Sequence, residues 1–570
     1  MSYKANETQQ VGLNDRLNNL TEKEKKVLMG SWAKPFADII FPSIREDFFA
    51  VLYSENKATR PNTPINIVIG AMIIKEIAGL SDNEMLENLS CDIRTQYALH
   101  TTSYAEQPMS DRTFSRFRQR LYEHEMRTGE DLMKDELLTQ ADKIAKFMDL
   151  QPNLKRMDSL MIASACKDMT RLEVIYVTVA NLVNAVHRVG GDELLQGMEH
   201  YLNPDDQNRV IYHNKAEDRI KKMQAMVEDC AALLERLGED GSGLPEYALA
   251  ARMLEDQSEI GNDGRRIAKN SHDIKPSSMQ NPSDPEATYR KKGGKGYTGY
   301  AANIVQTYDK KGAAVITDYE FQPNSHSDVE FGKEVLVGIA ESTKEGDTRK
   351  IELTADGAFA SEENSALAEL NGISFITTSL TGTKPPEILA NFMINSEEHR
   401  IELCPMGNKP EGQGWNMEKD TYRIVMEKNQ CANCPHRAEC KAQITKYHAY
   451  VTLSASKVER AKAVKEISSE AYVEYRNSRN AIEGLPSVLR RRYHVDYMPV
   501  FGLVKSKLFF GFKIAAINVK NLLKYTRGHR AFQSSAFIPR DHCACQISTF
   551  MPRGYCACET PTLIPRGECV

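Results

Sequence analysis

Long apolar runs are missing from this chain of 570 residues. No stretch approaches the roughly 18 apolar residues of a membrane-spanning helix, and the opening MSYKANETQQ holds no apolar signal core. We therefore expect a cytoplasmic protein with no membrane partner. The hydrophobic content of 41% and the charged content of 26% are ordinary for a globular protein, and the length predicts about two to four domains.

An overall excess of basic residues is also absent. The formal net charge is −5 and the isoelectric point is near 6.3, which argues against a globally basic, histone-like binder of nucleic acid. Nucleic-acid affinity would have to come from local patches. Residues 476–530 form such a patch, because they hold 12 Lys or Arg and only 2 acidic residues.

The twelve cysteines do not indicate a disulfide framework, because no secretory signal precedes them. Four of them form a group with a closely spaced pair at its centre: Cys404, Cys431, Cys434 and Cys440. A cysteine pair separated by two residues is typical of zinc-binding sites. We expect a structural Zn²⁺ ion here, with four reduced thiols as the alternative.

Residues 36–147 show the apolar spacing of helices. One expected helix begins near Ser110 and is rich in arginine, with Arg112 and Arg116 as candidate DNA contacts. Short helices with one arginine-rich member resemble a helix-turn-helix DNA reader. A plain helical bundle with a solvated arginine face fits the same residues.

Two aspartates lie at expected strands. Asp158 interrupts the apolar run 154–162, where a carboxylate is costly unless it is paired or bound to metal. Asp356 directly follows the expected strand 349–355, which places it at the edge of a sheet where ligand sites of α/β folds lie. A turn or cap for Asp158 and an ordinary Asp-Gly turn for Asp356 are the alternatives.

A β-hairpin is expected between the two aspartates. Its strands are 297–308 and 314–321, joined by the turn residues 309–312. Basic residues precede its first strand and are candidates to follow a phosphate backbone, unless they form a solvated loop: Arg290, Lys291, Lys292 and Lys295.

A third carboxylate, Glu483, lies inside the basic patch. It follows Arg479 by four residues and precedes Arg490 by seven, so a helix places all three on one face, with Pro486 as a point where the helix kinks or restarts. The alternative is an intrahelical ion pair. Three carboxylates of this kind are what a two-metal phosphoryl-transfer site requires, although the sequence leaves open whether they meet.

Taken in order, these motifs resemble bacterial insertion-sequence transposases of the DDE type over nearly all of residues 35–525. The motifs that carry the resemblance are Met157-Asp158-Ser159, the segment Asp284–Lys292 (DPEATYRKK), Thr354-Ala355-Asp356-Gly357 and Arg479-Asn-Ala-Ile-Glu483-Gly484.

The resemblance implies an α/β ribonuclease-H-like catalytic core with large, mainly helical insertions, after an all-α N-terminal domain. It implies that Asp158, Asp356 and Glu483 are the catalytic ligands of two Mg²⁺ (or Mn²⁺) ions that support in-line phosphoryl transfer. It also implies a DNA transposase that cleaves the terminal inverted repeats of its element and joins them to target DNA, acting as a homodimer.

The resemblance has one departure. Related enzymes carry Tyr, Arg, Glu and Lys on the last helix with two residues between Tyr and Arg, whereas three separate Tyr475 from Arg479 here and Arg490 replaces Lys. Both arginines suit phosphate contacts, because a guanidinium is planar and permanently charged. The full set of candidate DNA-binding residues is Arg112, Arg116, Arg290, Lys291, Lys292, Lys295, Arg479, Arg490, Arg491, Lys505 and Lys507.

We expect three parts of the chain: a helical DNA-binding domain (1–150), a catalytic domain (151–530) and a tail (531–570). The catalytic domain should carry a helical insertion at about 163–280 and a cysteine-containing insertion at about 380–460. The tail repeats at a period of 13 residues from residue 538 and holds two Cys-x-Cys pairs. Because so short a repeat cannot build a core, we expect a disordered, dispensable tail, translated from repeated DNA at the element's end.

Two other functions remain open on these residues. One is a hydrolytic endonuclease with the same three carboxylates. The other is a catalytically silent, zinc-stabilised DNA-binding protein derived from a transposase. The intact set of carboxylates favours an active enzyme, because a silent relative would be free to lose a costly buried acid.

Overall fold

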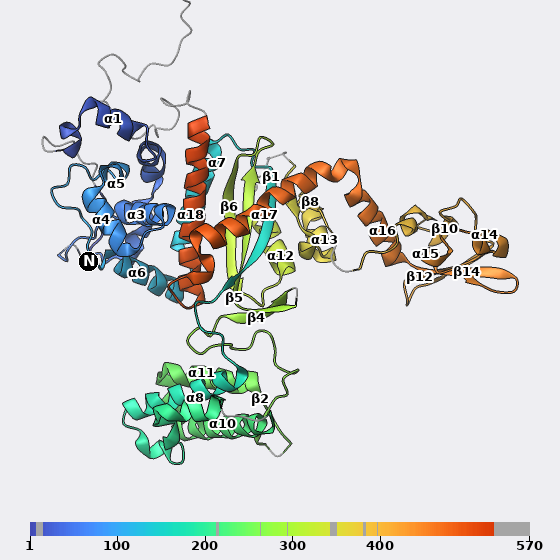
Figure 1. The fold of residues 1–570 in the computed structure, drawn as a ribbon, viewed down its shortest axis with the longest axis horizontal. Coiled ribbons are helices and arrows are strands. Elements are labelled where there is room, and N and C mark those ends of the chain that lie inside the picture. The colour runs from blue at the N-terminus through green and yellow to red at the C-terminus, as the bar shows by residue number, and fades with distance from the viewer. Residues whose placement is uncertain are drawn as a thin grey trace, which may run out of the picture. The chain divides into compact units, whose positions relative to one another are not determined.

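The computed structural model describes residues 1–6, 15–56, 58–212, 216–262, 264–292, 294–342, 350–379, 383–395 and 397–528. The expected tail 531–570 lies outside these residues. The chain divides into two compact units: the first contains residues 1–150, 309–317 and those from 492 on, and the second contains residues 151–308 and 318–491. Element labels are those of Figure 1.

The first unit is helical. Its α-helices are α1 (Glu22–Met29), α2 (Ala33–Pro35), α3 (Ile65–Ala78), α4 (Asp82–Cys91), α5 (Ile93–Ala98), α6 (Thr113–Thr128), α7 (Leu132–Phe147) and α18 (Leu503–Gly528). Shorter helical turns are η1 (Arg16–Asn19), η2 (Phe36–Ile40), η3 (Phe41–Ser43), η4 (Glu46–Leu52) and η11 (Val495–Tyr497).

Helix α3 forms the centre of this unit, because it is apolar on all sides and buried along nearly its whole length. It ends at Gly79, whose φ of 72° is the left-handed conformation that favours glycine. Ser81 and Glu84 then form a capping box at the start of α4. Helix α18 packs against α3 and α7, and its buried apolar side chains join the same core. This is why residues 492–528 group with the first unit and not with the remainder of the expected catalytic domain.

A mixed β-sheet organises the second unit. Its strands are β1 (Leu154–Ala163), β4 (Thr288–Lys292), β5 (Lys295–Tyr308), β7 (Glu352–Ala355) and β8 (Ser374–Thr377), in the order β4-β5-β1-β7-β8, with β6 (Ala314–Pro323) paired to β5. Strand β1 is antiparallel to β5 and parallel to β7, which is parallel to β8. The expected hairpin is therefore present as β5 and β6.

Two helices cover one face of this sheet, as Figure 1 shows: α12 (Asp328–Ser342) and α13 (Glu362–Leu370). Apolar residues of β1, β5 and β7 pack with them into one core that includes Met157, Val305, Phe331 and Leu353. The combination of helices with a mixed sheet confirms the expected α/β character. The finer assignment to a ribonuclease-H-like fold stays a prediction.

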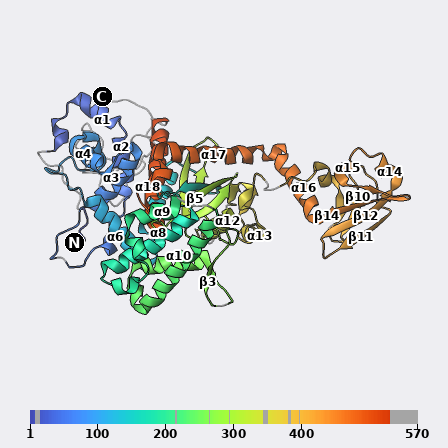
Figure 2. The ribbon, with the colours of Figure 1, turned by 60° about the horizontal axis from the view of Figure 1, so that its bottom comes forward.

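A helical segment is inserted after β1, visible in Figure 2. It consists of α8 (Arg171–Arg188), η5 (Asp192–Leu195), η6 (Glu199–Leu202), α9 (Pro204–Tyr212), α10 (Ala216–Leu237), η7 (Gly238–Gly243) and α11 (Pro245–Gln257), followed by the short pair β2 (Ser258–Ile260) and β3 (Arg266–Ala268). These helices share a separate hydrophobic core. The segment lies within the residues, about 163–280, where a helical insertion was expected.

A small β-rich subdomain follows β8, and its strands were not predicted. It contains η9 (Glu387–Asn391), β9 (Met393–Asn395), β10 (Arg400–Leu403), β11 (Gly412–Asn416), β12 (Thr421–Glu427), α14 (Lys428–Ala432), α15 (Arg437–Cys440), β13 (Gln443–Ile444), β14 (His448–Ser454) and α16 (Ala455–Ser468). The sheet order is β11-β12-β14-β13, and one face of this sheet packs with η9 and α16.

Helix α17 (Val473–Tyr493), preceded by η10 (Glu470–Tyr472), carries Glu483. It continues through Pro486 as one helix. Two hydrogen bonds join it to β1: Arg156 donates to the carbonyl oxygen of Ser478 at 2.9 Å, and Arg490 donates to that of Met161 at 2.6 Å. None of the helices that the structure describes is long and apolar enough to cross a membrane.

Candidate active site

Asp158 lies in the middle of β1, next to the buried Met157. Its side chain is only 14% exposed, and one carboxylate oxygen accepts a hydrogen bond from the Ser159 amide at 3.0 Å. The sequence interpretation of an acid within a strand is correct, and the turn or cap alternative for Asp158 is wrong.

Asp356 comes directly after β7, the parallel neighbour of β1. The register pairs Arg156 of β1 with Thr354 of β7. Two residues further along, Asp158 and Asp356 therefore lie side by side. Asp356 also caps the turn η8 (Gly357–Phe359), where its Oδ1 accepts from the Ala358 amide at 2.8 Å. This bond holds one oxygen in place, and the other, Oδ2, lies 3.6 Å from Arg479.

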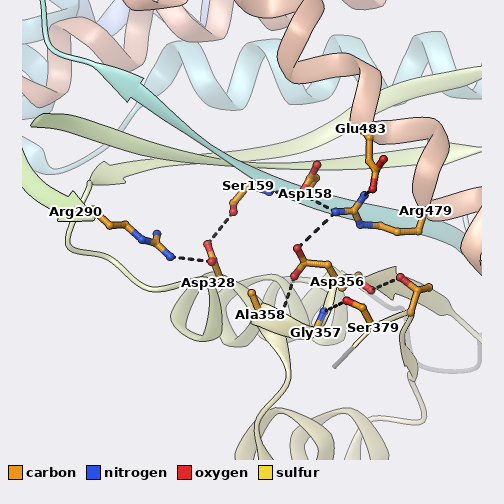
Figure 3. Close-up of polar contacts among 12 residues, drawn as sticks. Asp158, Ser159, Arg290, Asp328, Asp356, Gly357, Ala358, Ser379, Arg479 and Glu483 are labelled. Atoms are coloured by element: carbon orange, nitrogen blue, oxygen red, sulfur yellow. Dashed lines mark hydrogen bonds and ion pairs between the residues drawn. The ribbon is translucent and has the colours of Figure 1, made fainter. Parts of the chain in front are cut away.

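One guanidinium connects all three predicted carboxylates, as Figure 3 shows. Arg479 lies 3.2 Å from Asp158 Oδ1, 3.6 Å from Asp356 Oδ2 and 3.1 Å from Glu483 Oε1. Its side chain is 7% exposed, whereas that of Glu483 is 60% exposed. The intrahelical ion pair foreseen as an alternative for Glu483 is thus present, and it is part of a larger cluster that joins β1, β7 and α17.

The electrostatics of this cluster act most strongly on Asp158. Burial raises its pKa to about 6, the positive charge of Arg479 opposes the rise, and the nearby Asp356 adds to it. Lys292 also lowers this pKa, which places the cation of β4 within electrostatic range of the site. The carboxylates of Asp158 and Asp356 therefore repel one another, and the nearby cations stabilise their charged forms.

The donor set suits a divalent cation. Carboxylate oxygens are the hard ligands that Mg²⁺ and Mn²⁺ prefer, and three of them converge on a single positive group. Within the described residues, no group of three or more His, Cys, Asp or Glu side chains is arranged to hold a metal ion. The guanidinium of Arg479 neutralises the same carboxylate charges that such an ion would neutralise.

A fourth acid, Asp328, lies beside the cluster and was missed in the sequence. It is buried at the start of α12, accepts a hydrogen bond from Ser159 Oγ at 2.8 Å, and pairs with Arg290 at 2.8 Å. Arg290, predicted to contact DNA, is therefore held by a carboxylate. Asp328 sits near the start of a helix, where an acid is common, so no sequence signal distinguished it from an ordinary first-turn residue.

The remaining predicted DNA contacts fall into two groups. Seven are exposed at the surface: Arg112, Arg116, Lys291, Lys292, Lys295, Arg491 and Lys505. Lys507, in contrast, forms ion pairs with Glu125 and, at 2.9 Å, with Asp131, so its charge is neutralised inside the first unit. Arg490, although exposed, is committed to the backbone of β1.

The four grouped cysteines line one small cavity of about 30 Å³ in the β-rich subdomain, together with His436. Burial and the neighbouring thiols raise the pKa of Cys440 to about 11. All four cysteines are free of disulfides. Cys404 thus lies with Cys431, Cys434 and Cys440, as the zinc interpretation requires. Their thiols are not arranged to hold a metal ion in the described residues.

Two stretches of the chain match protein-family models. Residues 403–523 match the model of a transposase DDE domain, and residues 23–120 match that of a transposase domain known as DUF772. No curated protein and no solved structure matches the chain. The expected resemblance to insertion-sequence DDE transposases is confirmed by both matches, which cover parts of the two units. Transposase-family domains support a transposase function in general and imply DNA as the partner.

Proposed function

We propose that this protein is an insertion-sequence transposase that cleaves the terminal inverted repeats of its element and joins them to target DNA. The observation that carries the proposal is the convergence of Asp158, Asp356 and Glu483 on one cation, Arg479. These acids come from two adjacent strands and one helix that are far apart in the sequence. A purely structural ion pair would need only one of them.

In this proposal the three carboxylates hold two Mg²⁺ or Mn²⁺ ions. Bound divalent cations would neutralise charge on the scissile phosphate and favour deprotonation of an attacking oxygen. Asp356, with one oxygen held by the Ala358 amide, has its second oxygen 3.6 Å from Arg479, which also contacts Asp158. Glu483 is the most exposed of the three, so it can adjust its position when a ligand arrives.

The chain's own cations would position the DNA strand. Lys292 lies within electrostatic range of Asp158, and the exposed Lys291 and Lys295 continue the basic run beside it. The reaction then breaks the bond between phosphorus and the 3′ oxygen while a new bond forms to water, or to a 3′ hydroxyl in the joining step. Because the two steps differ only in the attacking oxygen, one site serves both.

Zinc is the second part of the proposal. We propose that Cys404, Cys431, Cys434 and Cys440 hold a structural Zn²⁺ ion. A cavity of about 30 Å³ has room for a single ion, since one water already needs about 10–15 Å³ of such space. Binding would require the thiols to lose their protons and turn toward the cavity centre.

A plasmid-cleavage experiment tests the proposed activity. Supercoiled plasmid carrying the native ends of the element is incubated with Mg²⁺ or Mn²⁺ and with wild-type protein or Glu483→Gln. We expect metal-dependent cutting at the ends by wild type and at least a hundredfold less by the variant, because the substitution removes a metal-ligating charge. Cutting without joining would favour the hydrolytic endonuclease.

Equal cutting by both proteins would remove Glu483 from the active site. Tight binding to the ends with no cutting by either would favour the silent DNA-binding protein. The proposed homodimer is checked in the same samples, by the mass of the complex that forms on paired ends.

A further inference from the structure

A second cavity lies within the first unit and is separate from the carboxylate cluster. It has a volume of about 630 Å³, within the range of about 300–1,000 Å³ typical of ligand pockets. All of its lining residues belong to the first unit, from α3, α4 and α6 and from the segment between residues 492 and 513. None of them belongs to the proposed metal site.

The lining of this cavity is basic. Five Lys or Arg residues face only two acids, Glu76 and Asp82. The two acids already pair with three of these cations, at 3.3 Å for Lys75 with Asp82 and at 3.0 Å for Lys513 with Glu76, and through a short contact between Arg118 and Asp82. The other two cations, Arg492 and Lys505, have no carboxylate within ion-pair distance among the described residues.

The wall of the cavity also holds an unpartnered polar group. Tyr493 is 3% exposed, and its buried hydroxyl has no hydrogen-bond partner among the described residues. Behind it, the ammonium of Lys520 lies 4.9 Å from the centre of the Tyr493 ring and is likewise buried without a partner. Burial and the charge of Arg492 lower the pKa of Lys520 to about 8. These two buried donors are out of reach of a ligand in the cavity, so the exposed Arg492 and Lys505 are the groups open to one.

The chemistry of the wall matches a nucleotide. A phosphate would pair with Arg492 and Lys505, because its oxygens accept hydrogen bonds and carry negative charge. Tyr497, which also lines the cavity, is 81% exposed and offers a ring on which a base can stack. A paired base within a duplex offers no free face, whereas an unpaired nucleotide can enter a pocket of this size.

We propose that the cavity bounded by Tyr493, Arg492, Lys505 and Tyr497 binds an unpaired nucleotide of a DNA strand. The proposal rests on the proposed transposase function for the identity of the polymer, but it concerns DNA binding in the first unit and not cleavage. Arg492 and Lys505 hold the phosphate, and Tyr497 stacks on the base.

Binding of labelled DNA in EDTA tests this, because no cleavage takes place there. One probe is a blunt duplex and the other is the same duplex with a short single-stranded extension. We expect wild type to prefer the extended probe by about tenfold or more, as one stacked base contributes about 1–3 kcal/mol. Arg492→Ala/Lys505→Ala should lose this preference. The matched control is Lys524→Ala/Arg527→Ala, which removes two exposed cations of the same unit outside the cavity and should keep it.

Tyr497→Ala separates ligand binding from a structural role, because the Tyr497 side chain is 81% exposed. It removes the stacking ring and little buried surface, so we expect weaker binding of the extended probe with an unchanged Tm. Unchanged preference in both Tyr497→Ala and the double variant would overturn the proposal. Competition by deoxyadenosine monophosphate, with no effect of the extension, would likewise overturn it in favour of a free nucleotide.

The outcomes for the two proposals can be told apart. Glu483→Gln is expected to bind both probes as wild type does. If wild type binds neither probe, DNA recognition itself fails, and with it the proposed function. If it binds both probes equally and is insensitive to the cavity variants, the cavity proposal fails while the transposase proposal stands.

Discussion

Arg479 is the residue on which the carboxylate cluster depends. Its guanidinium contacts two carboxylates on neighbouring strands and a third on its own helix. Without it, Asp158 and Asp356 would face each other with no buried counter-charge, which is strongly unfavourable. A divalent cation would supply the same positive charge, so the guanidinium and the metal would stabilise the same carboxylates.

Removal of the Arg479 charge should therefore destabilise the protein most when no metal is present. For Arg479→Gln in EDTA we expect the free energy of unfolding to fall by about 3 kcal/mol, since a buried acid loses its partner. Thermal unfolding with and without Mn²⁺ measures this, and the gain in Tm on adding Mn²⁺ should be larger in the variant than in wild type.

Arg491→Gln is the matched control for this experiment, because Arg491 lies exposed on the same helix. It should change neither the Tm in EDTA nor the response to Mn²⁺. An equal Mn²⁺ response in Arg479→Gln and wild type would show that arginine and metal do not share a site.

Asp158 gives a pH dependence of stability. Its pKa of about 6 in the folded chain lies above the ordinary value near 3.8, so the folded state takes up a proton as the pH falls through 6. The destabilising effect of its charge is therefore full above pH 6 and decreases toward pH 4. We expect the stability of Asp158→Asn relative to wild type to be about 1 kcal/mol greater at pH 8 than at pH 5.

Denaturant unfolding at the two pH values measures this difference. Glu418→Gln, at an exposed position of the second unit, serves as the control and should show no such change. A relative stability of Asp158→Asn that does not vary with pH would contradict the raised pKa.

At the scale of elements, the β-rich subdomain brings Cys404, which follows β10, to cysteines carried by α14, α15 and the loop between them. If zinc binds there, it fixes the two short helices to the sheet, because helices of four and five residues are marginal on their own. The metal would then contribute to the folding of the whole subdomain.

Metal analysis of purified protein tests the zinc site. We expect about one equivalent of Zn²⁺ per chain in wild type, its loss in Cys434→Ser, and a lower Tm on chelation. Cys166→Ser is the control, because this thiol lies outside the group and should leave the zinc content unchanged. Absence of zinc from wild type prepared in its presence would leave the group as four reduced thiols.

At the scale of the whole molecule, the first unit is assembled from both ends of the chain. Helix α18 contributes Leu508, Phe512, Val519 and Leu522 to the core that α3 and α7 build. Lys513 and Lys507 add ion pairs to Glu76 and Asp131. A single helix with such a buried face contributes many kcal/mol, because each fully buried large apolar side chain is worth about 1.5–3 kcal/mol.

Fragment 1–150 should therefore not fold alone. We expect circular dichroism to show a loss of cooperative unfolding in this fragment, and co-expression with residues 492–528 to restore it. Deletion of residues 529–570, in contrast, should leave the Tm within a degree or two and keep activity, which also tests the expectation of a dispensable tail. A cooperative transition of fragment 1–150 by itself would contradict the role of α18.

The local pattern of residues was enough to predict many features of this chain. An apolar run with one acid predicted β1 with Asp158, and turn chemistry predicted the β5–β6 hairpin. These features depend on neighbours within a few residues, so they can be read without the fold. The strands of the β-rich subdomain were not predicted, although β12 and β14 alternate buried with more exposed residues, the pattern typical of a half-buried strand.

Only the tertiary structure decided which distant residues meet. It paired Arg479 with Asp158 over 321 positions and joined α18 to the N-terminal helices. It also showed that Arg290 and Lys507, predicted to contact DNA, are neutralised by Asp328 and Asp131. The physical reason is that a charge becomes free or paired through contacts across the fold, whereas a helix, strand or turn is determined mainly by the residues next to it along the chain.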